Sequence, residues 1–187
     1  MITGHLGLAL GARAVDPEAP LGWLVLAAIA PDLADLALAA GGVCNPDGAY
    51  THSLAAIAAT ALVLGAAAFW RTHRGRAALV VGALVVSHLL ADYLTGLKAL
   101  WVGGPVVGLN LYQWRWVDFA LEAAVVWAGW AAGKRWGELP RWLASRYALL
   151  GLVAFQFAAD AASKPQDTQP PTVCAKADLI DKLEHLF

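Results

Sequence analysis

Charged residues are scarce in this chain. Asp, Glu, Lys and Arg make up 14% of its 187 residues, against about 25% in ordinary soluble domains. Hydrophobic residues account for 59%. A soluble body of this length would have to hide several long apolar runs with very few charges on its surface. The deficit argues against a soluble enzyme and indicates an integral membrane protein.

The sequence also lacks an excess of either charge. Its formal net charge is −1 at pH 7. Binding to nucleic acid requires a strongly basic surface, so we expect no nucleic-acid partner. The partners that the composition favours are the membrane itself and molecules that reside in it.

Apolar runs of membrane-spanning length fill most of the chain. A helix needs about 20 apolar residues to cross a ~30 Å hydrocarbon core. Five spanning helices are expected, over residues 21–40, 53–70, 77–101, 117–133 and 146–163. Residues 2–14 are apolar but short, which suits a half-spanning or re-entrant helix. The sequence therefore predicts an all-α polytopic membrane helix bundle, with one membrane-embedded domain over residues 1–163.

Basic residues mark two of the loops between these helices. Residues 71–76 contain three arginines, and residues 134–146 contain four basic side chains. Residues 41–52 contain none. Basic loops remain on the cytoplasmic side of a membrane. We therefore expect a multi-pass protein of the inner (cytoplasmic) membrane, with residues 41–52 on the periplasmic or extracellular side.

The C-terminal residues 164–187 differ from the rest of the chain because they are polar and rich in proline. They predict a flexible tail on the outer side. Its last residues, ADLIDKLEHLF, favour a short amphipathic helix on the membrane surface or a poorly ordered terminus. Cys44 and Cys174 both fall on the outer side, and the sequence leaves open a disulfide between them.

Six ionisable side chains interrupt the apolar segments. A carboxylate near the middle of a bilayer costs roughly 2.5–3.5 kcal/mol on insertion scales, so such residues point to function. Imidazole and carboxylate together are ligands for a divalent metal. Loop charge places all six at one depth, in the outer half of the membrane. The predicted metal ligands are His5, Asp32, Asp35, His52, His88 and Asp92.

The spacing within two of the helices supports a shared site. His88 and Asp92 are four residues apart, and Asp32 and Asp35 are three apart, so each pair lies on one helix face. Pro31 breaks the local backbone ladder, as in helices that line cavities. Simpler roles remain open. Asp32 could cap a helix, Asp35 could interact with the helix dipole, and His88 could hydrogen-bond Asp92.

Four motifs contain these residues: TGHLG around His5, the PDLADL run, THS at 51–53 and SHLLADYLTG at 87–96. In their order and spacing they resemble the YdjM-like family of membrane-bound metal-dependent hydrolases. The resemblance covers about residues 1–125. The stretch at 47–50 departs from the family pattern, which often has His-Arg-Gly before THS. The family is similar to the zinc-dependent phospholipase C and nuclease class, so the resemblance implies a hydrolase with these six residues as ligands.

Six ligands exceed the needs of one tetrahedral zinc and suit two ions about 3.5–4 Å apart. Zinc fits mixed nitrogen and oxygen ligands, with manganese as an alternative. Either Asp35 or Asp92 would bridge the ions. An ion would acidify the attacking water. The expected catalytic residues are Asp35, Asp92 and His52.

A site at the outer headgroup level suggests a lipid or lipid-linked substrate with a phosphate ester. Further polar residues near the outer ends of the helices are predicted to bind it: Lys98, Asn110, Arg115 and Glu122. Asp118 lies four residues before Glu122 and could help orient the histidines or pair with Arg115. Two other functions stay open, an ion or proton-coupled transporter and a non-catalytic protein stabilised by metal. The sequence leaves the oligomeric state undetermined.

Overall fold

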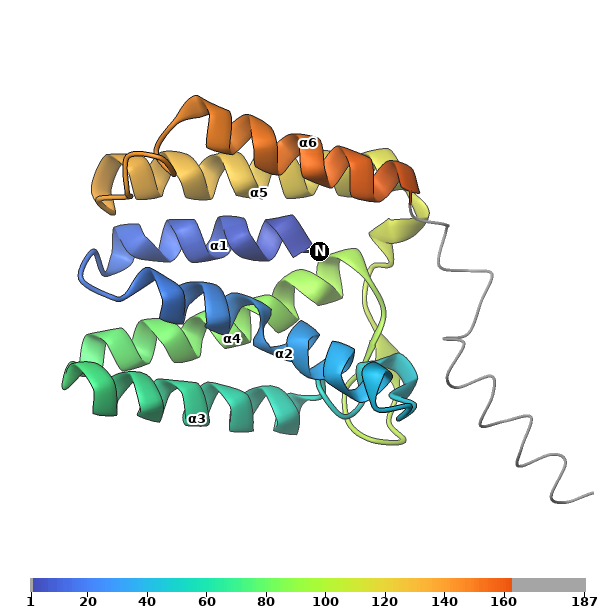
Figure 1. Ribbon diagram of the computed structural model, residues 1–187. Helices are drawn as coiled ribbons and strands as arrows, with labels where there is room; N and C mark the ends of the chain where they lie inside the picture. Colours follow the sequence, from blue (N-terminus) through green and yellow to red (C-terminus); the bar gives the residue numbers. More distant parts are fainter. Residues whose placement is uncertain (1, 163–187) are drawn as a thin grey trace, which may run out of the picture.

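The computed structural model describes residues 2–162, and Figure 1 shows them as stacked layers of helices. Helix α1 lies in the middle, with α5 and α6 on one side and α2, α4 and α3 on the other. Two one-turn 3₁₀ helices, η1 (Pro46–Gly48) and η2 (Leu111–Gln113), lie in the connections. The α-helices in this part of the chain are α1 (Ile2–Val15), α2 (Leu21–Ala40), α3 (Leu54–Thr72), α4 (Gly75–Thr95), α5 (Arg115–Trp136) and α6 (Arg146–Ala162).

Three helices among the described residues, α2, α3 and α4, are long and apolar enough to cross a membrane. The mostly helical fold is therefore confirmed, and it contains three helices that could span a membrane. Helix α5 carries charged residues in its first turns, and α6 has only 17 residues. Five complete spans and a half-spanning α1 stay predictions. The expected tail and Cys174 lie outside the described residues.

One segment expected to be helical has another structure. Helix α4 ends at Thr95 instead of continuing to residue 101. A two-stranded antiparallel hairpin follows, formed by β1 (Lys98–Ala99) and β2 (Val106–Val107). Its turn contains Gly103, whose φ of 71° favours glycine. The all-α prediction is therefore wrong here, and the hairpin brings Lys98 back over the end of the bundle.

The turns that join α1 to α2, α3 to α4 and α5 to α6 gather at one end of the bundle (Figure 1). Arg74, in the α3–α4 turn, forms ion pairs with Asp16 at 2.9 Å and Glu18 at 3.2 Å. Arg13 donates to the carbonyl of Gly137 at 3.0 Å. This basic end is thus held together by polar contacts. The N-terminus of α1, the C-terminus of α4 and the hairpin lie at the opposite end.

Helix α1 packs tightly against α5. A Cβ on Gly129 would lie 1.9 Å from the carbonyl oxygen of Gly7, and a Cβ on Gly7 would lie 2.7 Å from the Cα of Val126. Only glycine permits backbones to approach this closely. This contact fixes α1 in the interior of the bundle, and with it the position of His5.

Candidate metal centre

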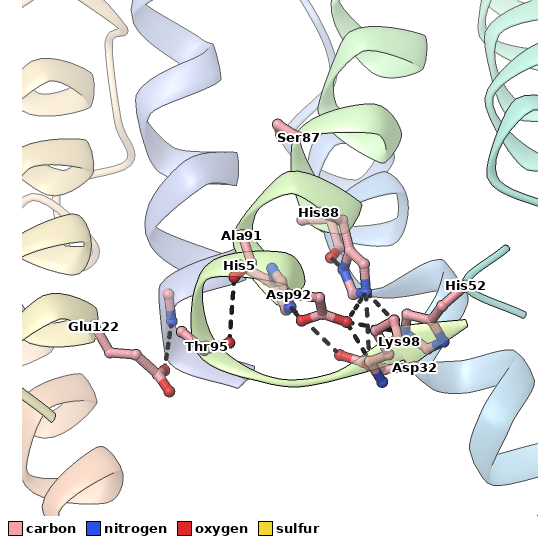
Figure 2. A network of polar contacts seen from close by, with 12 residues as sticks. His5, Asp32, His52, Ser87, His88, Ala91, Asp92, Thr95, Lys98 and Glu122 are labelled. Atoms are coloured by element: carbon pink, nitrogen blue, oxygen red, sulfur yellow. Dashed lines mark hydrogen bonds and ion pairs between the residues drawn. The ribbon is translucent and has the colours of Figure 1, made fainter. Parts of the chain in front are cut away.

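Five of the six predicted ligands meet in the half of the bundle away from the basic end. Figure 2 shows their side chains pointing toward one another from α1, α2, α4 and the loop before α3. Ligand atoms of four of them lie within 4.8 Å of one another, and His52 joins them with its Nε2 3.2 Å from that of His88. The five are His5, Asp32, His52, His88 and Asp92.

His5 contacts one oxygen of each carboxylate. Its Nε2 lies 3.1 Å from Oδ1 of Asp92 and 3.9 Å from Oδ2 of Asp32. The imidazole is fully buried and stacks on the His88 ring, with centroids 3.7 Å apart. His5 therefore presents its Nε2 from the α1 side of the group.

His52 and His88 contact the other oxygens of the same carboxylates. The Nε2 of His52 lies 3.4 Å from Oδ1 of Asp32 and 3.2 Å from Oδ2 of Asp92. The Nε2 of His88 lies 3.7 Å and 3.5 Å from these same two atoms. Asp32 and Asp92 thus each direct one oxygen to His5 and the other to the His52–His88 pair.

These distances fit a bound divalent cation. Donors bound tetrahedrally at 2.0–2.1 Å lie about 3.4 Å apart, and the contacts between the facing donor atoms of this group are 3.1–3.9 Å. The buried Oδ2 of Asp92 has no hydrogen-bond partner. Such an oxygen would gain a partner in a cation. The group could therefore hold a metal ion.

A backbone carbonyl sets the tautomer of His88. Its Nδ1 lies 2.6 Å from the carbonyl oxygen of Ala28 on α2. A carbonyl only accepts, so Nδ1 carries the hydrogen. The lone pair of the neutral ring then lies on Nε2, which faces the carboxylates. This arrangement is typical of histidines that bind metals.

A chain of side chains orients His52 in the same way. The hydroxyl of Thr51 lies 2.7 Å from Nδ1 of His52 and accepts from the amide of Asn45 at 2.8 Å. The amide of Asn45 also donates to Asp35 at 2.5 Å. The hydroxyl has its own acceptor in the carbonyl of Gly48, at 3.5 Å, so it can accept the Nδ1 hydrogen of His52. The Nε2 of His52 is then left to bind a metal.

Asp35, a predicted ligand and bridge, lies behind His52. Its closest contact with that ring is 3.9 Å from Nδ1, on the side away from Asp32 and Asp92. Asp35 therefore helps to hold His52 in place and is not one of the donors that face one another. Burial disfavours the charged form of His52, but the nearby carboxylates of Asp32 and Asp92 outweigh burial and raise the pKa of the ring.

The centre opens toward the protein surface at Asp32. The side chain of Asp32 is 34% exposed, whereas that of Asp92 is 4% exposed. Lys98, from β1, has its Nζ 3.6 Å from Oδ2 of Asp92. The structure thus places the ammonium group of Lys98 beside the donors.

Another predicted substrate residue, Glu122, lies in a different part of the bundle. Glu122 is on the α5 side of α1, where it accepts from the backbone amide of Gly4 at 3.0 Å. Asn110 precedes η2 (Leu111–Gln113) with a φ of 52°, and Arg115 begins α5. Burial raises the pKa of Tyr112, in η2. None of these features connects Glu122, Asn110 or Arg115 with the centre.

Sequence reasoning missed the groups that orient the histidines. Thr51 was detectable, because it directly precedes His52. The carbonyl of Ala28 has no signature in sequence, since every residue carries one. Asn45 lies seven residues before His52, and only the fold of the loop brings it close.

The fold and the site define the class of protein. It is a helical chain with membrane-length helices and a buried His/Asp group that could hold a metal ion. Comparisons with protein-family models, curated proteins and solved structures found no match. The chemistry of the donors is therefore the basis on which a function can be assigned.

Proposed function

We propose that the protein is an integral membrane metal-dependent hydrolase that cleaves a phosphate ester of a lipid or lipid-linked substrate. One observation carries the proposal: three imidazole nitrogens and both oxygens of two aspartates face one another inside a helical bundle. The motifs around these residues, and their resemblance to YdjM-like hydrolases, support the same function.

The split contacts of the carboxylates favour two ions. His5 would hold one ion, and His52 with His88 would hold the other. Asp32 and Asp92 would bridge them, since each directs one oxygen to either side. When bound, such a pair activates water and offsets the charge that develops on a phosphate ester. Zinc suits these ligands best, with manganese as an alternative.

The residues around the donors have distinct tasks. The Ala28 carbonyl and Thr51 hold two histidines with Nε2 toward the centre. The ammonium group of Lys98 would bind a phosphate oxygen as a point charge. The exposed side of Asp32 leaves an approach for substrate, as catalytic sites require. A metal-stabilised site without catalysis would be closed on this side.

The placement of the centre favours a substrate that lies in the membrane. The basic turns form the opposite end of the bundle, which the positive-inside rule assigns to the cytoplasm. The centre would then face the outer side of the membrane, at the depth of the lipid headgroups. A phospholipid or a polyprenyl phosphate ester presents its scissile group at that depth.

The test is hydrolysis by detergent-purified protein loaded with zinc or manganese. Mixed micelles would contain a phospholipid or a polyprenyl phosphate ester, and the released product would be quantified. We expect turnover to fall more than 100-fold in Asp92→Asn. His73→Asn is the matched control, because His73 lies in the α3–α4 turn with a φ of 54° that Asn tolerates.

Two results would overturn the proposal. One is a folded, metal-loaded protein that cleaves none of these esters, and the other is full turnover in Asp92→Asn. Ion flux into proteoliposomes that needs Asp92 but consumes no ester would establish transport in its place.

A further inference from the structure

A second polar cluster lies on the other side of α1, where α1 meets α5 and α6. Asp118 and Glu122 of α5 and Asp160 of α6 each place one carboxylate oxygen within 4.8 Å of the others. Asp118 is 2% exposed and Glu122 is 1% exposed. Carboxylates so close and so buried repel one another unless a proton or a cation compensates them.

Two neutral side chains add oxygens to the cluster. The hydroxyl of Thr3 lies 2.5 Å from Oε1 of Gln156 and 3.1 Å from Oε2 of Glu122. Gln156 directs its amide nitrogen to Asp160, at 2.8 Å from both carboxylate oxygens. The hydroxyl has one hydrogen and cannot donate to two acceptors at once. The hydroxyl hydrogen of Thr3 can therefore lie in only one of these two oxygen–oxygen contacts, and the other contact lacks it.

Asp118 supplies an independent sign that a ligand is accepted here. Its Oδ1 is buried and has no hydrogen-bond partner. Native proteins rarely leave a buried carboxylate oxygen unsatisfied. The carboxylate that carries this oxygen is one of the three in the cluster. A cation in the cluster would satisfy it.

We propose that this cluster is a second cation site that takes a hard divalent ion, with calcium as the best fit. All of its donors are oxygens, and calcium binds six to eight oxygens in flexible geometry. The first centre has three imidazole nitrogens, which calcium does not favour. The donors of the second site are Thr3, Asp118, Glu122, Gln156 and Asp160.

The cation would stabilise the start of α1. Glu122 binds the hydroxyl of Thr3 and the backbone amide of Gly4, and His5 is the next residue along the chain (Figure 2). An ion held by these groups would tie α1 to α5 and α6. The second site would therefore help to keep His5 in place without binding substrate.

The test is equilibrium dialysis of the detergent-purified full chain against radioactive calcium, with zinc already bound. We expect one calcium per chain, at least tenfold weaker binding in Asp118→Asn, and unchanged binding in His73→Asn. Asp47→Asn is a control for charge, because Asp47 is exposed in η1 (Pro46–Gly48). Calcium should also raise the Tm of the wild type but not that of Asp118→Asn.

A second pair of variants applies if Asp118→Asn does not fold. Thr3→Val should weaken calcium binding several-fold, and Thr3→Ser should bind as the wild type does. No bound calcium at millimolar concentration would overturn the proposal. So would calcium binding that is equal in the wild type and Asp118→Asn, or in Thr3→Val and Thr3→Ser. Zinc content measures the first centre separately.

Discussion

The Nδ1 atom of His88 lies 2.6 Å from the carbonyl oxygen of Ala28, across the interface of α4 and α2. Pro31 follows three residues after Ala28 and has no backbone N–H. Figure 1 shows α2 bent at its middle, as proline causes. The carbonyl of Ala28, which faces the imidazole, thus lies within one turn of this irregularity. Asp32 directly follows the proline.

Replacing this proline should weaken the centre although no ligand is removed. Pro31→Ala restores an N–H that can bond to the carbonyl of Ala27 and straighten α2. We expect zinc affinity to fall by roughly tenfold, the usual effect of losing support for a ligand. The measurement is competitive chelation on the purified protein. Leu36→Ala, at an exposed position of α2, should bind as the wild type does, and equal affinity of Pro31→Ala would contradict the prediction.

The hydroxyl of Thr51 should matter for metal binding because it fixes the His52 ring. Thr51→Val keeps the shape but removes the acceptor for Nδ1. Zinc affinity should fall roughly 10–100-fold. Thr51→Ser retains the hydroxyl and should restore most of the affinity. If both variants bind zinc equally well, the hydroxyl has no such role.

Metal stoichiometry should show whether His5 holds an ion apart from the one at His52 and His88. With two ions bridged by Asp32 and Asp92, His5→Ala removes the only imidazole on one side. We expect two zinc ions per wild-type chain and one in His5→Ala, measured by mass spectrometry of metals. His73→Asn should retain two. A single ion in the wild type would show that the carboxylates do not bridge.

The contact of α1 with α5 should be intolerant of a methyl group. In Gly129→Ala, the added Cβ would lie 1.9 Å from the carbonyl oxygen of Gly7, so the helices must separate. Overpacking of this kind costs about 1–3 kcal/mol, and it should also displace His5. Gly151→Ala is the control, since nothing lies within 4 Å of a Cβ there. Thermal unfolding should show a lower Tm for Gly129→Ala alone.

Lys98 should act on the substrate and not on the metal. Lys98→Met removes the charge beside Asp92 but keeps a similar apolar stem. If the proposed hydrolysis is correct, KM for the phosphate ester should rise about tenfold, with zinc content unchanged. The control is Lys134→Met, because Lys134 lies over the Trp130 ring near the C-terminal end of α5. It should leave KM unchanged. A loss of zinc in Lys98→Met would assign a structural role to Lys98.

Much of the helical architecture was predictable from apolar run lengths. The prediction of 53–70 corresponds to α3 at Leu54–Thr72, and that of 21–40 matches α2. The end of α4 was not predictable, because residues 97–101 continue the apolar run apart from Lys98. The glycine-containing turn lets this segment pair as a hairpin with Val106–Val107. Hydropathy alone cannot distinguish a buried strand from the end of a helix.

The candidate ligands were predictable because carboxylates and imidazoles are rare in apolar helices. Their division into facing donors and supporting groups was not. Asp32 and Asp35 are three residues apart on one helix, yet Asp32 faces the other donors while Asp35 bonds to Asn45. Helical spacing predicts that both carboxylates lie on one face of α2. The bend at Pro31 and the path of the loop before α3 decide which side chains each carboxylate contacts.

The sequence by itself determined that this is a helical chain of membrane character with an unusual set of histidines and aspartates. Composition and the lengths of the apolar runs are enough for that conclusion. The reason is that the free-energy cost of placing a polar side chain in an apolar segment depends on the neighbouring sequence alone. Only the tertiary structure decided which atoms face one another. It placed His5 through the Gly7–Gly129 contact and turned His88 through the Ala28 carbonyl. Such contacts join residues far apart in the chain, and the physics that sets them is close packing between helices.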